Sequence, residues 1–159
     1  MLETSTDMLI ESFAAALETT AFMVVEPPEP GPDGRPVIPA FTSAVVVTIA
    51  LTGSITGALL LAAPRGLGAL IASNILALDP ASPQAAERAE DALQETLNVT
   101  TGLYLARRCG LGGVTPEMGM PVISVLPDAE AWGRLAERPG AAIVMADGFP
   151  LLVHVSEAA

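Results

Sequence analysis

Four polar or small residues near the middle of the chain have side-chain types and a spacing that could do chemistry together. Asp91, Glu95, Asn98 and Gly102 follow one another at offsets of 4, 7 and 11 residues from the first. At about 100° per residue of α-helix, these offsets fall within a stripe roughly 60° wide. The spacing therefore predicts that Glu95 and Asn98 point to solvent together, one helical turn apart.

The chemistry open to this stripe follows from the groups it carries. A carboxamide such as that of Asn98 both donates and accepts hydrogen bonds, so it can orient a water molecule for attack. The carboxylate of Glu95 can pair with a cation, and Gly102 lets another surface approach the helix closely. Acidic and amide side chains are, however, also the ordinary outer face of an amphipathic helix, so spacing alone leaves both interpretations open.

A long helix is expected to position these residues. Ser82 and Pro83 suit its N-cap and first turn, and Gly110 suits its C-terminal cap. The pattern predicts a single helix over 83–109. Its buried face is expected to consist of Ala89, Leu93, Thr96, Leu97, Thr100, Leu103 and Tyr104.

The remaining segments predict helices alternating with hairpins. Thr6 is expected to cap a first helix over 6–22, and the proline-rich stretch 27–39 is expected to be a connecting loop. The predicted elements are a short strand over 23–26, a hairpin of 41–52 and 57–62, a helix over 64–78, a strand over 120–126, a helix over 129–137 and a hairpin of 141–145 and 149–155. We therefore expect an α+β fold, a mainly antiparallel sheet with flanking helices, in one domain over 1–159.

Composition and charge exclude several classes of protein. A net charge of −11 is unfavourable for binding nucleic acid or an anionic membrane surface. The uncharged stretch 37–64 is better explained by two buried strands than by a transmembrane helix, because β-branched residues and Gly53 interrupt it. The single Cys109 and the absence of a secretory signal at the N-terminus predict a cytoplasmic protein without a structural zinc site.

The central motif resembles that of a known family. Asp91, Glu95, Asn98 and, after twenty-two further residues, Pro121 match the pattern of the CheC, CheX and FliY chemotaxis phosphatases. The stretch from Leu51 to Leu61 also resembles the glycine-spaced hairpin of that family, and 69–76 resembles the helix that follows it. A single Glu/Asn motif is most similar to CheX.

The resemblance implies a hydrolase that removes the aspartyl phosphate of a CheY-type response regulator. In that role Asn98 would orient the attacking water, and Glu95 would pair with the active-site lysine of the regulator. Mg²⁺ would be held by the regulator, so we expect no cofactor or metal site in this chain. The resemblance also implies a homodimer, and we expect the hairpin over 141–155 to supply an apolar edge for it.

Two other functions remain open at the level of sequence. One is a non-catalytic CheX-like module that binds phosphorylated regulators, and the other is a component of a flagellar switch or signalling complex. His154, Cys109 and Trp132 lack the neighbours that catalysis would need, so we expect structural roles for them.

Overall fold

The sheet forms the centre of the molecule. The computed structural model describes residues 2–38, 40–110 and 112–158. The sheet has seven strands in the order β1-β6-β7-β3-β2-β4, with β5 also paired to β2, and all the pairs are antiparallel. The strands are β1 (Val25–Glu26), β2 (Ala44–Thr52), β3 (Gly57–Ala63), β4 (Glu117–Met118), β5 (Val122–Leu126), β6 (Ala141–Ala146) and β7 (Phe149–Glu157).

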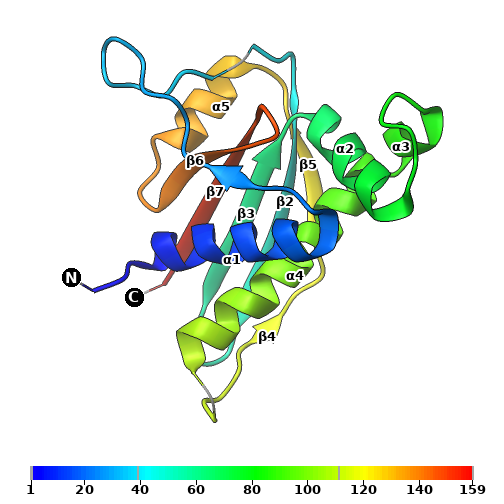
Figure 1. Ribbon diagram of the computed structural model, residues 1–159. Coiled ribbons are helices and arrows are strands. Elements are labelled where there is room, and N and C mark those ends of the chain that lie inside the picture. The colour runs from blue at the N-terminus through cyan, green and yellow to red at the C-terminus, as the bar shows by residue number, and fades with distance from the viewer. Residues whose placement is uncertain (1, 39, 111, 159) are drawn as a thin grey trace.

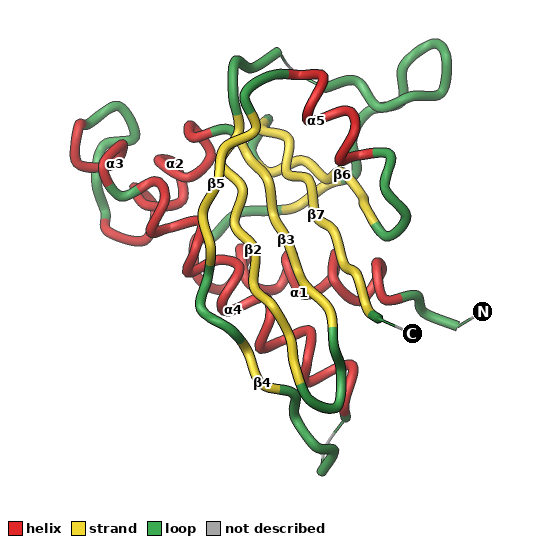
Figure 2. The backbone as a smooth tube through the Cα atoms, turned by 180° about the vertical axis from the view of Figure 1, so that it is seen from behind, coloured by secondary structure: helices red, strands yellow, loops and turns green. Residues whose placement is uncertain are grey.

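Helices cover the two faces of this sheet unequally. Figures 1 and 2 show α1, α2 and α4 on one face and α5 at one end of the other. The helices are α1 (Ser5–Ala21), α2 (Arg65–Leu76), α3 (Pro83–Glu87), α4 (Ala89–Cys109) and α5 (Ala129–Ala136). The predicted α+β fold with a mainly antiparallel sheet and flanking helices is therefore confirmed.

Successive side chains of β2 point alternately into two hydrophobic layers, one on each face of the sheet. Val45, Val47 and Ile49 belong to the large cluster beneath α1, α2 and α4. Ala44 and Val46 face the opposite way, into a smaller cluster with Trp132 of α5. This alternation arises because successive side chains of a strand point to opposite faces of the sheet.

The β2–β3 hairpin was predicted correctly, and glycine explains its shape. Gly53 begins the turn at φ 98°, a conformation that favours glycine. At Gly57, a Cβ atom would lie 1.9 Å from the carbonyl oxygen of Ser156 in the neighbouring β7. Glycine at this position therefore lets the central strands approach each other.

The start of α1 differs from the prediction. Thr4, and not Thr6, is the N-cap, and it forms a capping box in which Thr4 and Asp7 satisfy each other's backbone N–H groups. The hydroxyl of Thr4, and then its backbone N–H, donate to the carboxylate of Asp7 and hold the pKa of this group below its usual value. The hydroxyl of Thr6 instead donates to the carbonyl oxygen of Gly140, 3.4 Å away.

The long helix predicted over 83–109 is wrong in one respect, because it is two helices. Ser82 caps α3 through the N–H of Ala85, and the helix is interrupted at Arg88, whose φ and ψ are −93° and 0°. The α4 helix then begins at Ala89, where its backbone packs directly on α2. A Cβ on Gly68 would lie 2.5 Å from the Ala89 carbonyl oxygen, so the start of α4 is set by this contact.

The C-terminal hairpin formed as predicted, around a tight turn at Asp147 and Gly148 with φ of 47° and 82°. Its second strand is interior, however, because β7 also pairs with β3. No helix within the described ranges is long and apolar enough to cross a membrane.

Candidate functional site

The α4 helix presents the stripe that the spacing predicted. Asp91, Glu95, Asn98 and Gly102 are all exposed. The opposite face is buried in the core, with the exception of Leu103, which is 37% exposed. The structure therefore brings Glu95 and Asn98 together on one solvent-facing side, one turn apart on a well-anchored helix.

The polar groups of Glu95 and Asn98 are available to an incoming molecule. Among the described residues, neither side chain forms a hydrogen bond or an ion pair within the protein. Asp91 differs, because Arg88 lies 3.5 Å from its carboxylate. The polar atoms of the two candidate residues are thus not engaged by any other described residue of the protein.

Buried threonines line the inner side of α4. The hydroxyls of Thr96, Thr100 and Thr101 each donate to the carbonyl oxygen four residues earlier, at 2.7 Å. These bonds satisfy the hydroxyls locally, so the core needs no further polar partner to bury them. Threonine at position 96 is therefore compatible with the packing of α4.

The C-terminal part of α4 is fastened to the neighbouring elements by charged groups. The guanidinium of Arg108 lies 3.2 Å from the carboxylate of Glu157 in β7, and the buried hydroxyl of Tyr104 donates to the same carboxylate. Burial, and then this hydrogen bond, raise the pKa of Tyr104 to about 12. The hydrogen bond from Arg108 holds the pKa of Glu157 below its usual value.

A further ion pair fixes α4 to α1. Arg107 contacts the carboxylates of both Glu3 and Glu11. Together with the Glu157 cluster, this contact restrains rotation of α4 about its axis. The direction in which Glu95 and Asn98 point is therefore set by contacts that lie outside the stripe itself.

Gly102 has no steric role within the fold. Apart from the adjacent helix backbone, a Cβ atom added there would meet no atom of the described residues within 4 Å. Glycine inside a helix is less favourable than alanine by roughly 0.5–1 kcal/mol. The packing of the protein does not explain this residue, whereas the approach of another surface would.

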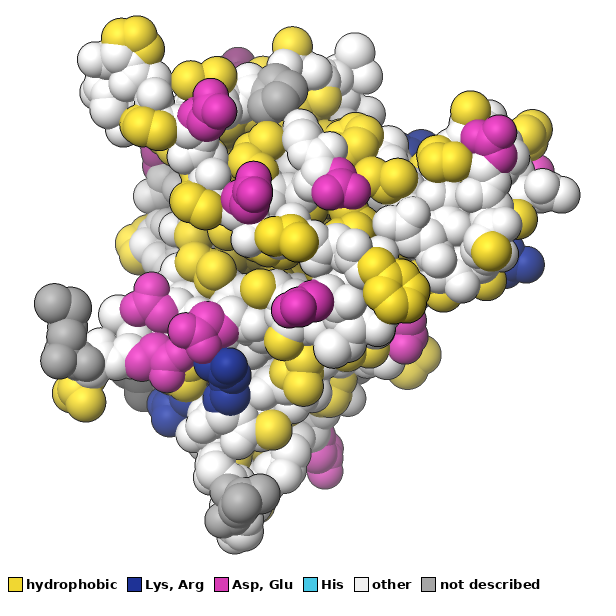
Figure 3. All heavy atoms as spheres, in the orientation of Figure 1, with side chains coloured by type: hydrophobic (Ala, Val, Ile, Leu, Met, Phe, Trp, Pro, Cys, Tyr) yellow, Lys and Arg dark blue, Asp and Glu magenta, His cyan; other side chains and the backbone are white. Residues whose placement is uncertain are grey.

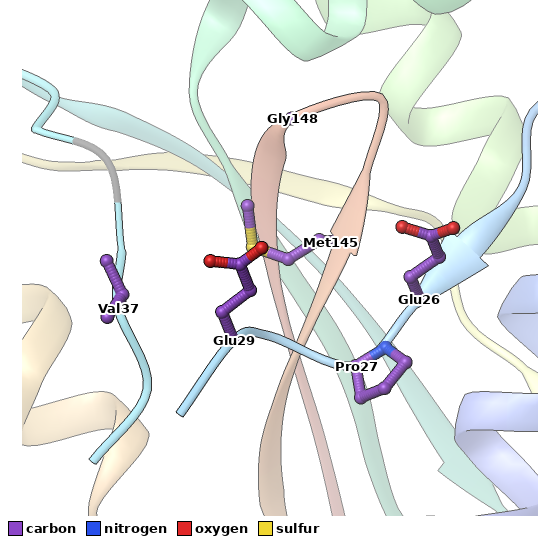
Figure 4. A pocket seen from close by; sticks show the side chains of 6 residues that line it. All are labelled: Glu26, Pro27, Glu29, Val37, Met145 and Gly148. Atoms are coloured by element: carbon purple, nitrogen blue, oxygen red, sulfur yellow. The ribbon is translucent and has the colours of Figure 1, made fainter. Parts of the chain in front are cut away.

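A hollow at the opposite edge of the sheet lies apart from the stripe. Figure 4 shows a hollow beside the proline-rich loop, lined by Glu26, Pro27, Glu29, Val37, Met145 and Gly148, which belong to the β1–β6 edge and the loop. No group of three or more His, Cys, Asp or Glu side chains that could hold a metal occurs in the part of the chain that the structure describes.

The residues expected to be structural have packing partners. Nε2 of His154 lies 3.0 Å from the carbonyl oxygen of Pro139, and Trp132 stacks edge to face on Phe41 at 4.8 Å. Cys109 is a partly buried free cysteine at the end of α4. Pro121, the last residue of the motif, is half-buried and directly precedes β5.

The surface charge agrees with the composition. Acidic side chains are spread over the face shown in Figure 3, and the few basic side chains of this view lie at its lower left and at its right edge. All seven cationic side chains of the chain are arginines. Arg107 and Arg108 are already paired with carboxylates, so the molecule offers little free positive charge to an anionic partner.

Comparison with known families decides the assignment. The family model described as chemotaxis phosphatase CheX matches residues 45–126, which include the β2–β3 hairpin and all of α4. The chain belongs to the CheX family. No curated protein matches the full sequence significantly.

Solved structures show that the CheX fold extends over the whole chain. The chemotaxis protein CheX of Vibrio vulnificus is 17% identical, with a TM-score of 0.68 and coverage of 99% of each chain. The CheX–CheY–BeF3–Mg²⁺ complex of Borrelia burgdorferi is 14% identical, with a TM-score of 0.62 over 99% of this chain and 100% of that chain. FliY of Thermotoga maritima is 18% identical, with a TM-score of 0.57 over 99% and 92%. At these identities the likeness concerns the fold.

Proposed function

We propose that this CheX-family protein accelerates hydrolysis of the aspartyl phosphate on a CheY-type response regulator. The observation that carries the proposal is the exposed pair of Glu95 and Asn98 on α4, without partners among the described residues. The similarity in fold to a CheX that is described in complex with CheY supports the choice of partner. Both residues lie within the matched part of the family model.

The proposed mechanism assigns Asn98 to the attacking water. Its amide accepts from and donates to a water aligned with the phosphorus atom, opposite the bond to the aspartate of the regulator. Attack by this water breaks that bond and releases inorganic phosphate and the free carboxylate. Catalysis then consists mainly of positioning, which suits a side chain held on a rigid helix.

The proposed role of Glu95 is docking. Its carboxylate would bind the active-site lysine of the regulator, and this contact would hold Asn98 in line with the phosphoryl group. Mg²⁺ would be bound by the regulator and would offset charge on the phosphoryl oxygens. The complex from B. burgdorferi is described as containing Mg²⁺ together with CheY and BeF3.

The deciding experiment follows phosphate loss from a phosphorylated regulator of the same organism. The wild-type protein should accelerate it, and Asn98→Ala should lower the added rate about a hundredfold because the water is no longer oriented. Binding of the BeF3-activated regulator should persist in this variant. Full acceleration by Asn98→Ala would refute the assignment.

Substitution of Glu95 separates docking from hydrolysis. Glu95→Gln should weaken binding of the activated regulator about tenfold, because one member of a charge pair is lost. Glu137→Gln, an exposed carboxylate beside α5, is the matched control and should bind normally. Binding without any acceleration by the wild-type protein would instead favour the non-catalytic module, and absence of phosphorylation-dependent binding would favour a structural component.

We also propose a homodimer, although the most suitable edge differs from the expected hairpin. Only β6 of that hairpin has an outer edge, and β1 covers it at Met145 and Ala146. Val122 and Val125 on β5 are 63% and 57% exposed, and β5 is paired on the side of β2. An exposed apolar edge strand favours pairing with a second copy.

The proposed partner implies a cytoplasmic protein, in agreement with its single free cysteine.

A further inference from the structure

A groove lies between α2 and α4, directly beside Glu95. The two helices pack against each other, since Gly68 of α2 lies against the backbone of Ala89 in α4, and Ala72 and Ala92 line the same space. The α2 helix ends at Leu76, and Ala77 follows in the left-handed conformation. The groove therefore includes the last turn of α2 and reaches Glu95 of α4.

The groove is apolar on its floor and on one wall. Ala72 and Ala92 are nearly buried at 2% and 7% exposure, and their small side chains leave a space of about 180 Å³. Ile75 and Leu76 form the wall and remain 43% and 52% exposed. A partner that covers apolar surface of this kind removes it from water, which favours binding by about 25 cal/mol per Å² of buried area.

A third apolar side chain is exposed at the same end of α2. The amide of Asn74 donates to the carbonyl oxygen of Ala21 at 3.0 Å, which joins the ends of α1 and α2. Phe22, the next residue, caps α1 with its side chain 82% exposed. In Figure 3, hydrophobic side chains are exposed over this region around α2.

The opposite wall of the groove carries the charges. Asp91 and Glu95 project from α4, and Arg88 is engaged with Asp91. Glu95 has no such neighbour among the described residues and is left with its negative charge. A surface that fits both walls therefore carries an apolar side chain next to a basic one.

We propose that this α2–α4 groove, formed by Ala72, Ile75, Leu76, Ala92 and Glu95, receives an aliphatic or aromatic side chain of the phosphorylated regulator. The side chain would lie next to the basic residue that Glu95 binds. This inference rests on the proposed function and adds a site that determines which regulator is chosen. Charge complementarity with Glu95 and continuity with the stripe identify the regulator as the occupant.

The groove and Asn98 then have separate effects on the reaction. Apolar contacts at Leu76 stabilise the complex before and during hydrolysis alike, so their loss raises KM. Asn98 acts on the water, so its loss lowers kcat. A residue with a purely structural role in the fold would instead lower the amount of active protein without a change in KM.

The experiment measures KM and kcat for the phosphorylated regulator, and Kd for its BeF3-activated form, with Leu76→Glu. A carboxylate at this wall should raise KM and Kd about tenfold or more, with the loss confined to these two constants. Leu76→Ala should change them in the same direction by a smaller factor. Val114→Glu, an equally apolar position that is 79% exposed in the loop after α4, is the matched control and should resemble the wild type.

The outcomes distinguish this inference from the function on which it rests. If the wild-type protein accelerates phosphate loss and Asn98→Ala does not, while Leu76→Glu and Val114→Glu share the wild-type KM, the function holds and the groove proposal is overturned. If activated regulator binds without hydrolysis and Leu76→Glu weakens that binding, the groove holds and catalysis is refuted. If no CheY-type regulator of the organism binds the wild-type protein, both are overturned.

Discussion

Gly102 weakens the α4 helix, and no packing contact among the described residues compensates for this loss of stability. It lies on the exposed stripe of α4, one turn beyond Asn98, and a Cβ atom there would have open space beyond the helix backbone within the part of the chain that the structure describes. Because glycine weakens a helix interior, a stable helix would favour alanine at this position. At the scale of single residues, the stripe therefore combines two polar groups that have no partner among the described residues with a position that carries no side chain.

Substitution of Gly102 should raise stability and lower docking. Gly102→Ala should increase the free energy of unfolding by roughly 0.5–1 kcal/mol, measured by urea denaturation. Gly102→Leu should raise KM for the phosphorylated regulator at least about fivefold, because the added side chain meets the docked surface.

Gly133 supplies the matched control, since it lies in α5 and also has open space around its Cβ position. Gly133→Ala should stabilise the protein similarly, and Gly133→Leu should leave KM unchanged. Equal KM values for the two leucine variants would show that no surface approaches Gly102.

At the scale of elements, α4 depends on the cluster of Tyr104, Arg108 and Glu157 for its attachment to β7. Glu157 must be ionised to accept these hydrogen bonds, and the lowered pKa of its carboxyl keeps it ionised under mildly acidic conditions. Tyr104 must remain protonated to donate its hydrogen bond. The attachment of α4 is therefore expected to weaken at strongly alkaline pH.

We assign the expected loss of folding stability at alkaline pH to Tyr104. Its pKa is raised from 10.0 to about 12 in the folded protein, so its contribution is complete below pH 10 and is lost as the pH rises towards 12. After allowance for solvent screening, the loss should be about 1–2 kcal/mol. Arginine remains charged in this range, so the pair of Arg108 and Glu157 persists.

Urea denaturation at several pH values between 9 and 12, in a Cys109→Ser background, measures this effect. The chain contains one tyrosine and no lysine, so few other side chains titrate in this window. Tyr104→Phe should be less stable at neutral pH by about 1 kcal/mol but should lose the decline above pH 10. The same decline in both proteins would contradict the assignment.

At the scale of the whole molecule, β5 leaves one edge of the sheet exposed, and we expect two copies to associate there. Light scattering at two concentrations should show a dimer. The double substitution Val122→Lys and Val125→Lys should shift it towards monomer, because charged edge strands resist pairing. Val37→Lys, at a residue that is 54% exposed in the proline-rich loop, is the control. A wild-type monomer at both concentrations would contradict the dimer.

The features that the sequence predicted correctly arise from contacts between residues close together in the chain. The exposed stripe of α4, the β2–β3 turn at Gly53 and the Asp147–Gly148 turn all follow from helical or strand periodicity and from backbone conformations that glycine favours. Helix geometry also placed Glu95 and Asn98 on one exposed face, whereas their selection as a functional pair rested on the resemblance to the chemotaxis phosphatases. Their catalytic roles remain a proposal.

Contacts between segments far apart in the chain decided the features that the sequence did not predict. Thr6 was expected to cap α1, but Thr4 caps this helix, and the hydroxyl of Thr6 meets Gly140 across the fold. Ala89 packs on Gly68 directly after the interruption at Arg88, and the α2–α4 groove exists because the last turn of α2 and Glu95 of α4 line one space. Local periodicity determines which face of a helix is polar, but only tertiary packing determines what lies beside that face.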